Sequence, residues 1–210
     1  MSTALHAIII GVDFFENKNA EYNPQDLRGC VSDALAVDDF LRRRLSIEDT
    51  RCKLLLSPLP TRHIEGRKFD DARAATVRKA LADAVAAVQP GDHVVLFYAS
   101  HGAHISDGVR REFVLLLQDS RSDVTTDEGA CSVLATWELN EALRQLAARA
   151  TVSVIADTCN SARATRSLDG GGGSVRMTEI SQLRPESYDR FLAARAGLPG
   201  SGAAQGAARP

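Results

Sequence analysis

The chain has 210 residues, a length that suits one domain of ordinary size. Its hydrophobic content of 44% and charged content of 25% are typical of a globular protein. The formal net charge of -2 argues against a strongly basic nucleic-acid binder, and no apolar run is long enough to cross a bilayer. We therefore expect neither a nucleic-acid partner nor a membrane partner.

The cysteines and the first residues bear on the compartment. Cys30, Cys52, Cys131 and Cys159 lack C-x-x-C spacing, which argues against both a zinc site and a disulfide framework. The first apolar run has no basic segment before it, so it resembles a strand more than a secretion signal. Both features predict a cytoplasmic protein.

Apolar patterns in the first part of the chain predict two strands and a helix. Residues 5–12 form a nearly continuous apolar run, typical of a strand buried on both faces of a parallel sheet. After a polar stretch, apolar residues recur at helical spacing over 30–45. A second short strand is predicted at 51–56, and a polar loop over 57–72 follows it.

The second part of the chain continues the alternation. The patterns predict a helix at 74–88, a strand at 93–99, a further strand at 112–117 that suits a hairpin, a helix at 136–150 and a strand at 151–156. Strands that alternate with helices favour parallel pairing and right-handed crossovers. The expected fold is an α/β sandwich with helices on both faces of the sheet.

The composition changes near residue 168. Four glycines follow one another at 170–173, and Gly and Ala dominate after residue 193. Such composition is typical of flexible segments. We therefore expect an ordered domain over 1–167 and a flexible tail over 168–210.

Two reactive side chains follow predicted strands. His101 comes directly after the strand at 93–99, and Cys159 comes after the strand at 151–156. Ligands of open parallel sheets bind beyond the carboxyl ends of the strands, so neighbouring strands would bring these residues together. A thiol beside an imidazole is a nucleophile beside an acid-base group. The backbone N–H groups of Gly102 and Cys159 are candidate donors to an oxyanion.

Four sequence blocks resemble those of one peptidase family. Residues 97–102 (FYASHG) resemble the histidine motif of caspases and metacaspases, and 157–162 (DTCNSA) resemble the metacaspase cysteine motif D-x-C-x-S-G. Residues 27–34 (LRGCVSDA) and 6–12 (HAIIIGV) are similar to two further metacaspase blocks. The blocks stand in the family's order over about 5–166. The glutamine-alanine-cysteine signature of caspases proper is missing, which favours the metacaspase branch.

This resemblance implies both a fold and a reaction. The fold would be a caspase-like three-layer α/β sandwich with a mostly parallel sheet. The reaction would be cleavage of protein or peptide substrates by a cysteine-type endopeptidase. The thiolate of Cys159 would attack the scissile carbonyl, while His101 would protonate the leaving amine and later activate water.

The resemblance also implies a substrate preference. Metacaspases select arginine or lysine before the cleaved bond (the P1 residue) with an acidic pocket. Asp33 and Asp157 match the acidic positions of that pocket, and Cys30 matches a wall position. A buried pair of carboxylates would bind a guanidinium through two parallel hydrogen bonds. By the same logic, Arg163 and Arg166 are candidate sites of self-cleavage, with ordinary surface arginines as the alternative.

Several positions depart from the family pattern. Asn160 replaces a histidine, Ala162 replaces a glycine, and Ser100 replaces the glycine before the histidine motif. Arg110 and Arg111 stand where calcium-dependent relatives carry carboxylates, so we expect no metal and no calcium activation. The alternative is a calcium site in the acidic loop, at Asp119, Asp123, Asp127 and Glu128.

The largest departure follows the nucleophile. The chain continues for 51 residues after Cys159, without a convincing apolar strand for the small-subunit part of a caspase domain. The sheet would then be incomplete at its C-terminal end. Either the chain is a fragment, or a partner chain or a dimer completes the sheet, or the protein is a reduced form of the domain. An uncovered edge strand favours association.

Three other interpretations stay open. The chain could be a non-catalytic caspase-like module that binds a partner through the cleft or the open edge. It could be an unrelated flavodoxin-like or nucleotide-binding domain, although no glycine-rich phosphate loop follows the first strand. It could also belong to another caspase-fold peptidase family, from which the block at 27–34 separates it.

Overall fold

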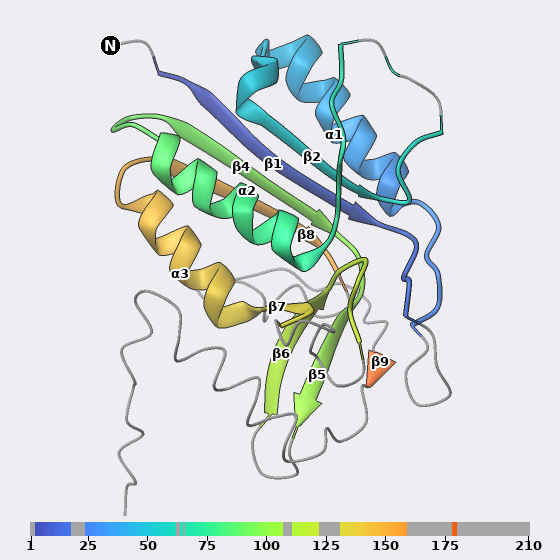
Figure 1. The fold of residues 1–210 in the computed structure, drawn as a ribbon. Helices are drawn as coiled ribbons and strands as arrows, with labels where there is room; N and C mark the ends of the chain where they lie inside the picture. The colour runs from blue at the N-terminus through green and yellow to red at the C-terminus, as the bar shows by residue number, and fades with distance from the viewer. Residues whose placement is uncertain are drawn as a thin grey trace, which may run out of the picture.

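The computed structural model describes residues 3–17, 24–61, 64, 66–106, 111–121, 131–158 and 178–179. These residues form an α/β fold (Figure 1). In chain order the elements are β1 (Leu5–Val12), α1 (Cys30–Leu45), the short 3-10 helix η1 (Asp49–Arg51), β2 (Cys52–Ser57), β3 (Asp70–Asp71), α2 (Ala74–Ala87), β4 (His93–Ala99), β5 (Gly102–Ser106), β6 (Arg111–Leu116), β7 (Val133–Ala135), α3 (Thr136–Ala147), β8 (Thr151–Asp157) and β9 (Thr178–Glu179).

The main sheet has five strands in the order β3-β2-β1-β4-β8, and all of its neighbouring strands are parallel. The chain therefore crosses over the sheet between strands, and helices supply three of these crossovers. This arrangement confirms the predicted α/β sandwich with a mostly parallel sheet.

Helices cover both faces of the main sheet. Alternate residues of β1 point to opposite sides, as the pleat of a strand requires. Ile8 and Ile10 pack into a core cluster with residues of α2 and α3, whereas Ala7 and Ile9 pack into a second cluster with residues of α1. Figure 1 shows the same three layers, with α2 and α3 on one face and α1 on the other.

A second, smaller sheet lies at the carboxyl ends of the main strands. Its order is β7-β6-β5-β9, with β5 and β6 forming an antiparallel hairpin and β9 parallel to β5. Leu116 and Tyr98 bind this sheet to the end of β4, because the N–H of Leu116 and the hydroxyl of Tyr98 both donate to the carbonyl of His101, at 3.0 Å and 3.1 Å. The hairpin thus holds the segment that carries His101.

Most element boundaries agree with the sequence patterns. The predicted bounds of β1, α1 and β4 are those of the structure, and β2, α2, β6, α3 and β8 differ by up to three residues at an end. The short strands β3, β5, β7 and β9 were not predicted, because two to five residues give no periodic signal. The predicted flexible tail lies outside the described residues except for β9.

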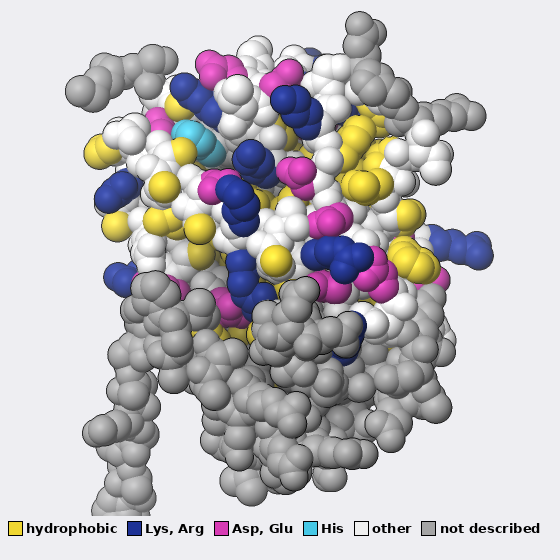
Figure 2. All heavy atoms as spheres, viewed as in Figure 1, with side chains coloured by type: hydrophobic (Ala, Val, Ile, Leu, Met, Phe, Trp, Pro, Cys, Tyr) yellow, Lys and Arg dark blue, Asp and Glu magenta, His cyan; other side chains and the backbone are white. Residues whose placement is uncertain are grey.

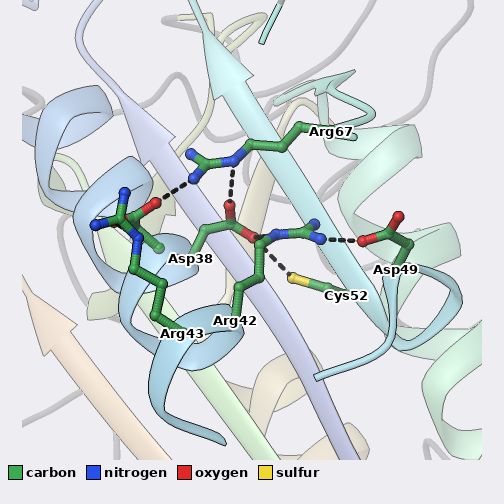
Figure 3. Close-up of polar contacts among 7 residues, drawn as sticks. Asp38, Arg42, Arg43, Asp49, Cys52 and Arg67 are labelled. Atoms are coloured by element: carbon green, nitrogen blue, oxygen red, sulfur yellow. Dashed lines mark hydrogen bonds and ion pairs between the residues drawn. The ribbon is translucent and has the colours of Figure 1, made fainter. Parts of the chain in front are cut away.

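A buried carboxylate anchors α1 to its surroundings (Figure 3). Asp38 is fully buried and accepts a hydrogen bond from Nε of Arg42 at 2.8 Å, while Nε of Arg67 lies 3.2 Å from its other oxygen. The thiol of Cys52 on β2 also donates to Asp38, at 3.3 Å. Arg67 belongs to the segment between β2 and β3, so one carboxylate joins three parts of the fold.

The molecular surface carries mixed charge. Figure 2 shows basic and acidic side chains interspersed over the face on which α2 and α3 lie. Among the described residues, no helix combines the length and the apolar character that crossing a membrane requires.

Candidate active site

Three neighbouring strands end side by side where the reactive residues were predicted. Gly11 on β1 pairs with Ala99 on β4, and Ala99 pairs with Asp157 on β8. The segments that follow these strands therefore leave the sheet at the same edge. His101 follows β4 within this edge, as predicted.

The His101 ring is fixed by a backbone carbonyl and an aromatic ring. The side chain is buried, its Nε2 lies 3.0 Å from the carbonyl oxygen of Gln25, and Phe15 stacks on it with ring centroids 5.5 Å apart. A carbonyl oxygen can only accept, so Nε2 must carry the hydrogen. In the neutral ring, Nδ1 then holds a free lone pair.

The surroundings of His101 favour this neutral form. Burial lowers the pKa of His101 below its usual value, and the hydrogen bond to the Gln25 carbonyl opposes that shift. Nδ1 is buried and has no hydrogen-bond partner within the described part of the chain. A neutral imidazole with an available Nδ1 is equipped to accept a proton from a nearby thiol.

Gly102 follows His101 at a point where a side chain does not fit. A Cβ at this position would overlap the ring of Phe113 and lie 2.7 Å from the hydroxyl oxygen of Thr158. The backbone at Gly102 therefore lies directly against Thr158 on the segment that follows β8. The use of the Gly102 N–H near the nucleophile stays a prediction.

Ser100, which departs from the family pattern, has structural contacts. Its hydroxyl donates to the carbonyl of Leu116 at 3.0 Å, and its N–H donates to the carbonyl of Asp157 at 3.3 Å. The side chain thus helps to hold the His101 segment against β6, while the backbone continues the contact between β4 and β8.

The predicted nucleophile lies outside the described residues, which end in this region at Thr158. The candidate self-cleavage residues Arg163 and Arg166 also lie outside them. The thiol and the donor at Cys159 therefore stay predictions. Within the described part, the structure gives the imidazole, the adjacent glycine and the strand that leads to the nucleophile.

The predicted pocket residues gather around one thiol. Burial, followed by the negative charges of Asp13, Asp157 and Asp33 in that order, raises the pKa of Cys30 to about 12. These four residues come from the end of β1, the first turn of α1 and the end of β8. The structure therefore brings together Cys30, Asp33 and Asp157.

One property of the pocket differs from the sequence-based expectation. Both carboxylates were expected to be buried, but the side chains of Asp33 and Asp157 are exposed in this structure. The physical reason is their position: Asp33 lies in the first turn of α1, and Asp157 ends an edge strand. The acidic site is thus open to solvent rather than enclosed.

The other described thiols are unsuited to act as nucleophiles at neutral pH. Burial and, after it, the nearby Asp38 carboxylate raise the pKa of Cys52 to about 12, and burial also raises the pKa of Cys131. A thiol reacts through its thiolate form. The electrostatics therefore leave Cys159 as the candidate nucleophile among the cysteines of the chain.

Asp119, one of the four candidate calcium ligands, serves another purpose. Its carboxylate accepts the N–H of Ala74 at 2.9 Å and so holds the start of α2. Asp123, Asp127 and Glu128 lie outside the described residues. Within the described ranges, no group of three or more His, Cys, Asp and Glu side chains could hold a metal ion. The expectation about calcium stays a prediction.

Sequence reasoning missed three residues of this site. Gln25 acts through its backbone carbonyl, which no side-chain pattern can reveal. Phe15 lies in a stretch that looked like a polar loop, although its own ring is fully buried. Asp13, directly after β1, accepts hydrogen bonds from the N–H groups of Cys30 and Val31, and its position after a strand was the available signal.

Comparisons with known proteins bear on the family and the fold. The family model of the metacaspase, peptidase C14 domain, matches residues 6–167. A search of curated proteins found no match. Among solved structures, the crystal structure of the protein GSU0716 from Geobacter sulfurreducens is similar, with a TM-score of 0.56 and 21% sequence identity. The alignment covers 74% of this chain and 50% of that one, so this chain spans about half the length of that structure.

Proposed function

Because the chain belongs to the metacaspase peptidase C14 family, we propose that it is a cysteine endopeptidase that uses Cys159 and His101. The observation that carries the proposal is which ring nitrogen of His101 carries the hydrogen. Its Nε2–H is engaged by the Gln25 carbonyl, which leaves Nδ1 to take the proton of a thiol. The chain between Thr158 and the nucleophile is a single peptide bond, and Thr158 already lies against Gly102.

The proposed reaction proceeds in two halves. Nδ1 of His101 accepts the thiol proton, and the sulfur of Cys159 attacks the scissile carbonyl carbon to form a tetrahedral oxyanion. The backbone N–H groups of Gly102 and Cys159 stabilise that oxyanion. The C–N bond breaks as the imidazolium donates its proton to the leaving amine. His101 then deprotonates a water molecule that attacks the thioester and releases the acid and the thiol.

The proposed specificity is for arginine or lysine at P1. Asp33 and Asp157 are two carboxylates from different elements that act on one thiol, and this grouping supports an acidic pocket beside the nucleophile. Because both are exposed, a substrate guanidinium has access to them and covers them as it binds. By the same preference, Arg163 or Arg166 would be cleaved in the active enzyme, which an intact-mass time course checks.

Active-site labelling tests the proposed dyad. A peptidyl-arginine acyloxymethyl ketone should add once to the chain at pH 7, and peptide mapping should place the adduct on Cys159. His101→Gln should reduce the labelling rate by about 10²-fold or more, because the thiol loses its base. Adducts spread over Cys30, Cys52 and Cys131, or labelling that ignores the variant, would contradict the proposal.

The proposal also includes a second copy of the chain as partner and a cytoplasmic location. Within the described residues, β8 has a neighbour on one side only, and Ile155 on it is 51% exposed. An unpaired edge of this kind supports completion of the sheet by a second copy of the chain. Cys30, Cys52 and Cys131 are free thiols, which supports a reducing cytoplasm.

The second candidate function is a non-catalytic interaction module. The open β8 edge favours it, because a strand from a partner could bind there without any chemistry. Failure of the thiol to react with the arginyl probe, combined with stable capture of a second chain at β8, would favour this alternative.

A further inference from the structure

Asp13 takes a position that the proposed reaction does not use. It directly follows β1, where its N–H donates to the carbonyl of Ser57 at 2.6 Å and its own carbonyl accepts the N–H of Leu27 at 2.8 Å. Both backbone groups are thus engaged by neighbouring segments. This fixes the residue at the carboxyl edge of the main sheet, beside the proposed pocket.

The Asp13 carboxylate binds the first turn of α1. Oδ1 accepts the N–H of Cys30 at 2.9 Å, and Oδ2 accepts the N–H of Val31 at 3.2 Å. Gly29 precedes the helix and has no side chain to make such bonds. A residue from a distant strand therefore supplies the cap, and its negative charge suits the positive end of the helix.

The turn that Asp13 holds is the one that carries the proposed pocket. Cys30 is its first residue, and Asp33 lies in the same first turn, with its N–H bonded to the carbonyl of Gly29 at 2.7 Å. The helix also packs tightly on β1, because a Cβ at Gly11 would lie 2.5 Å from the carbonyl oxygen of Cys30. Strand and helix are thus locked together at this point.

We infer that Asp13 is a specificity-determining residue of the P1 pocket, which positions the first turn of α1 and adds a third negative charge for a basic side chain. The inference rests on the proposed function, because it concerns the same pocket. Among the carboxylates whose charge raises the pKa of the Cys30 thiol, Asp13 makes the largest contribution, ahead of Asp157 and Asp33. The negative charge that disfavours the Cys30 thiolate would attract a cationic P1 group beside Cys30.

A purely structural cap would behave differently. It would stabilise the fold and affect all substrates alike, whether or not they carry charge. A charged pocket residue instead changes the preference for arginine over citrulline, which has nearly the same shape and no charge. The ratio of the two affinities therefore separates the two roles.

The experiment measures binding in the Cys159→Ala variant, so that it does not depend on turnover. Two peptides, identical except for arginine or citrulline at P1, are titrated into Cys159→Ala and into Cys159→Ala/Asp13→Asn by calorimetry. Asparagine keeps one of the two acceptor oxygens for the helix and removes the charge. We expect the arginine-to-citrulline affinity ratio to fall by about tenfold in the Asp13→Asn variant.

A matched control comes from another helix whose start is held by a carboxylate. Asp119→Asn removes a charge from the carboxylate that accepts the N–H of Ala74 at the start of α2. It should lower the melting temperature without changing the affinity ratio. A second readout needs no ligand: Cys30 should be alkylated faster in the Asp13→Asn variant at pH 8, because loss of the charge lowers the pKa of that thiol.

The outcomes separate this inference from the proposed function. Preference for arginine in Cys159→Ala, with an unchanged ratio after Asp13→Asn, would overturn the role of Asp13 and leave the acidic pocket standing. Equal affinity for both peptides in Cys159→Ala would overturn the acidic pocket and the role of Asp13 together. Labelling of Cys159 would still report on the dyad in either case.

Discussion

His101 is held in one chemical state by what its two nitrogens contact. Nε2 faces a carbonyl that can only accept, and the ring lies under Phe15 in a buried position. The sequence predicted the residue because it follows a strand and precedes a glycine. It could not predict the tautomer, because the group that selects it is a backbone oxygen of a polar loop.

The buried imidazole makes stability depend on pH. Since burial lowers the pKa of His101 in the folded state, the unfolded chain binds its proton first as the pH falls below about 6.5. The stabilisation is thus present above that pH and is lost as the pH falls towards the lower, folded-state pKa. We expect urea midpoints of Cys159→Ala to decline between pH 7 and pH 5.

A matched variant isolates the contribution of His101 to this pH dependence. Cys159→Ala/His101→Gln lacks the titrating group, so its midpoint should decline less over the same range, whatever its stability at pH 7. Parallel declines for the two proteins would show that other groups cause the pH dependence and that His101 is not held neutral.

Gly102 offers a second test at this scale. Gly102→Ala places a methyl group against Phe113 and Thr158, which forces the backbone away from its position near the nucleophile. We expect kcat/KM on an arginyl peptide to fall by about 10²–10³-fold, as for loss of an oxyanion donor. Gly66→Ala is the control for backbone strain alone: a Cβ there meets open space, but the φ of 72° disfavours a side chain, so this variant should lose stability without losing kcat/KM. Equal activity of both variants would remove Gly102 from the mechanism.

At the scale of elements, α1 shows how a helix is held in place beside a site. Its start and its middle are held differently: Asp13 holds the first turn, while the Asp38 network joins the middle of the helix to β2 and to the segment of Arg67 (Figure 3). The helical spacing of apolar residues predicted the helix and its bounds. The ionic anchors were not predictable, because their partners are distant in sequence.

Removing the central carboxylate of this network should be costly. Asp38→Ala leaves the guanidinium groups of Arg42 and Arg67 without their buried partner, so we expect a loss of about 3–5 kcal/mol in the free energy of unfolding. Asp49→Ala removes the other partner of Arg42, but that side chain is 65% exposed. It should cost about 0.5 kcal/mol or less. Urea titrations with similar losses for both variants would contradict a dominant role of Asp38.

At the scale of the whole molecule, the parallel sheet determines where the site lies. The order β1-β4-β8 brings three distant segments to one edge, and this order follows from strands that alternate with helices. The sequence therefore predicted the layers and the edge that carries His101. Of the smaller sheet that braces this edge it predicted only β6, because β5, β7 and β9 are too short to give a periodic signal.

Among the described strands, β8 has a neighbour on one side only, and this open side predicts self-association. In an antiparallel pair centred on Val154, Asp157 would face Thr151 of the second copy, so no like charges oppose each other. We expect sedimentation analysis to detect a dimer that Ile155→Lys dissociates, because Ile155 is exposed on this edge strand and the new charges would lie close together. A monomer at all concentrations, or a dimer that is insensitive to Ile155→Lys, would contradict this mode of completion.

The central claim is that the chain is a Cys159–His101 peptidase for basic P1 residues. The most direct test compares the purified chain with Cys159→Ala on fluorogenic peptides that end in arginine, lysine or aspartate, with and without calcium. We predict hydrolysis after arginine or lysine but not aspartate, without a requirement for calcium, and its loss in Cys159→Ala. Hydrolysis that persists in Cys159→Ala, or no hydrolysis of any peptide, would contradict the claim.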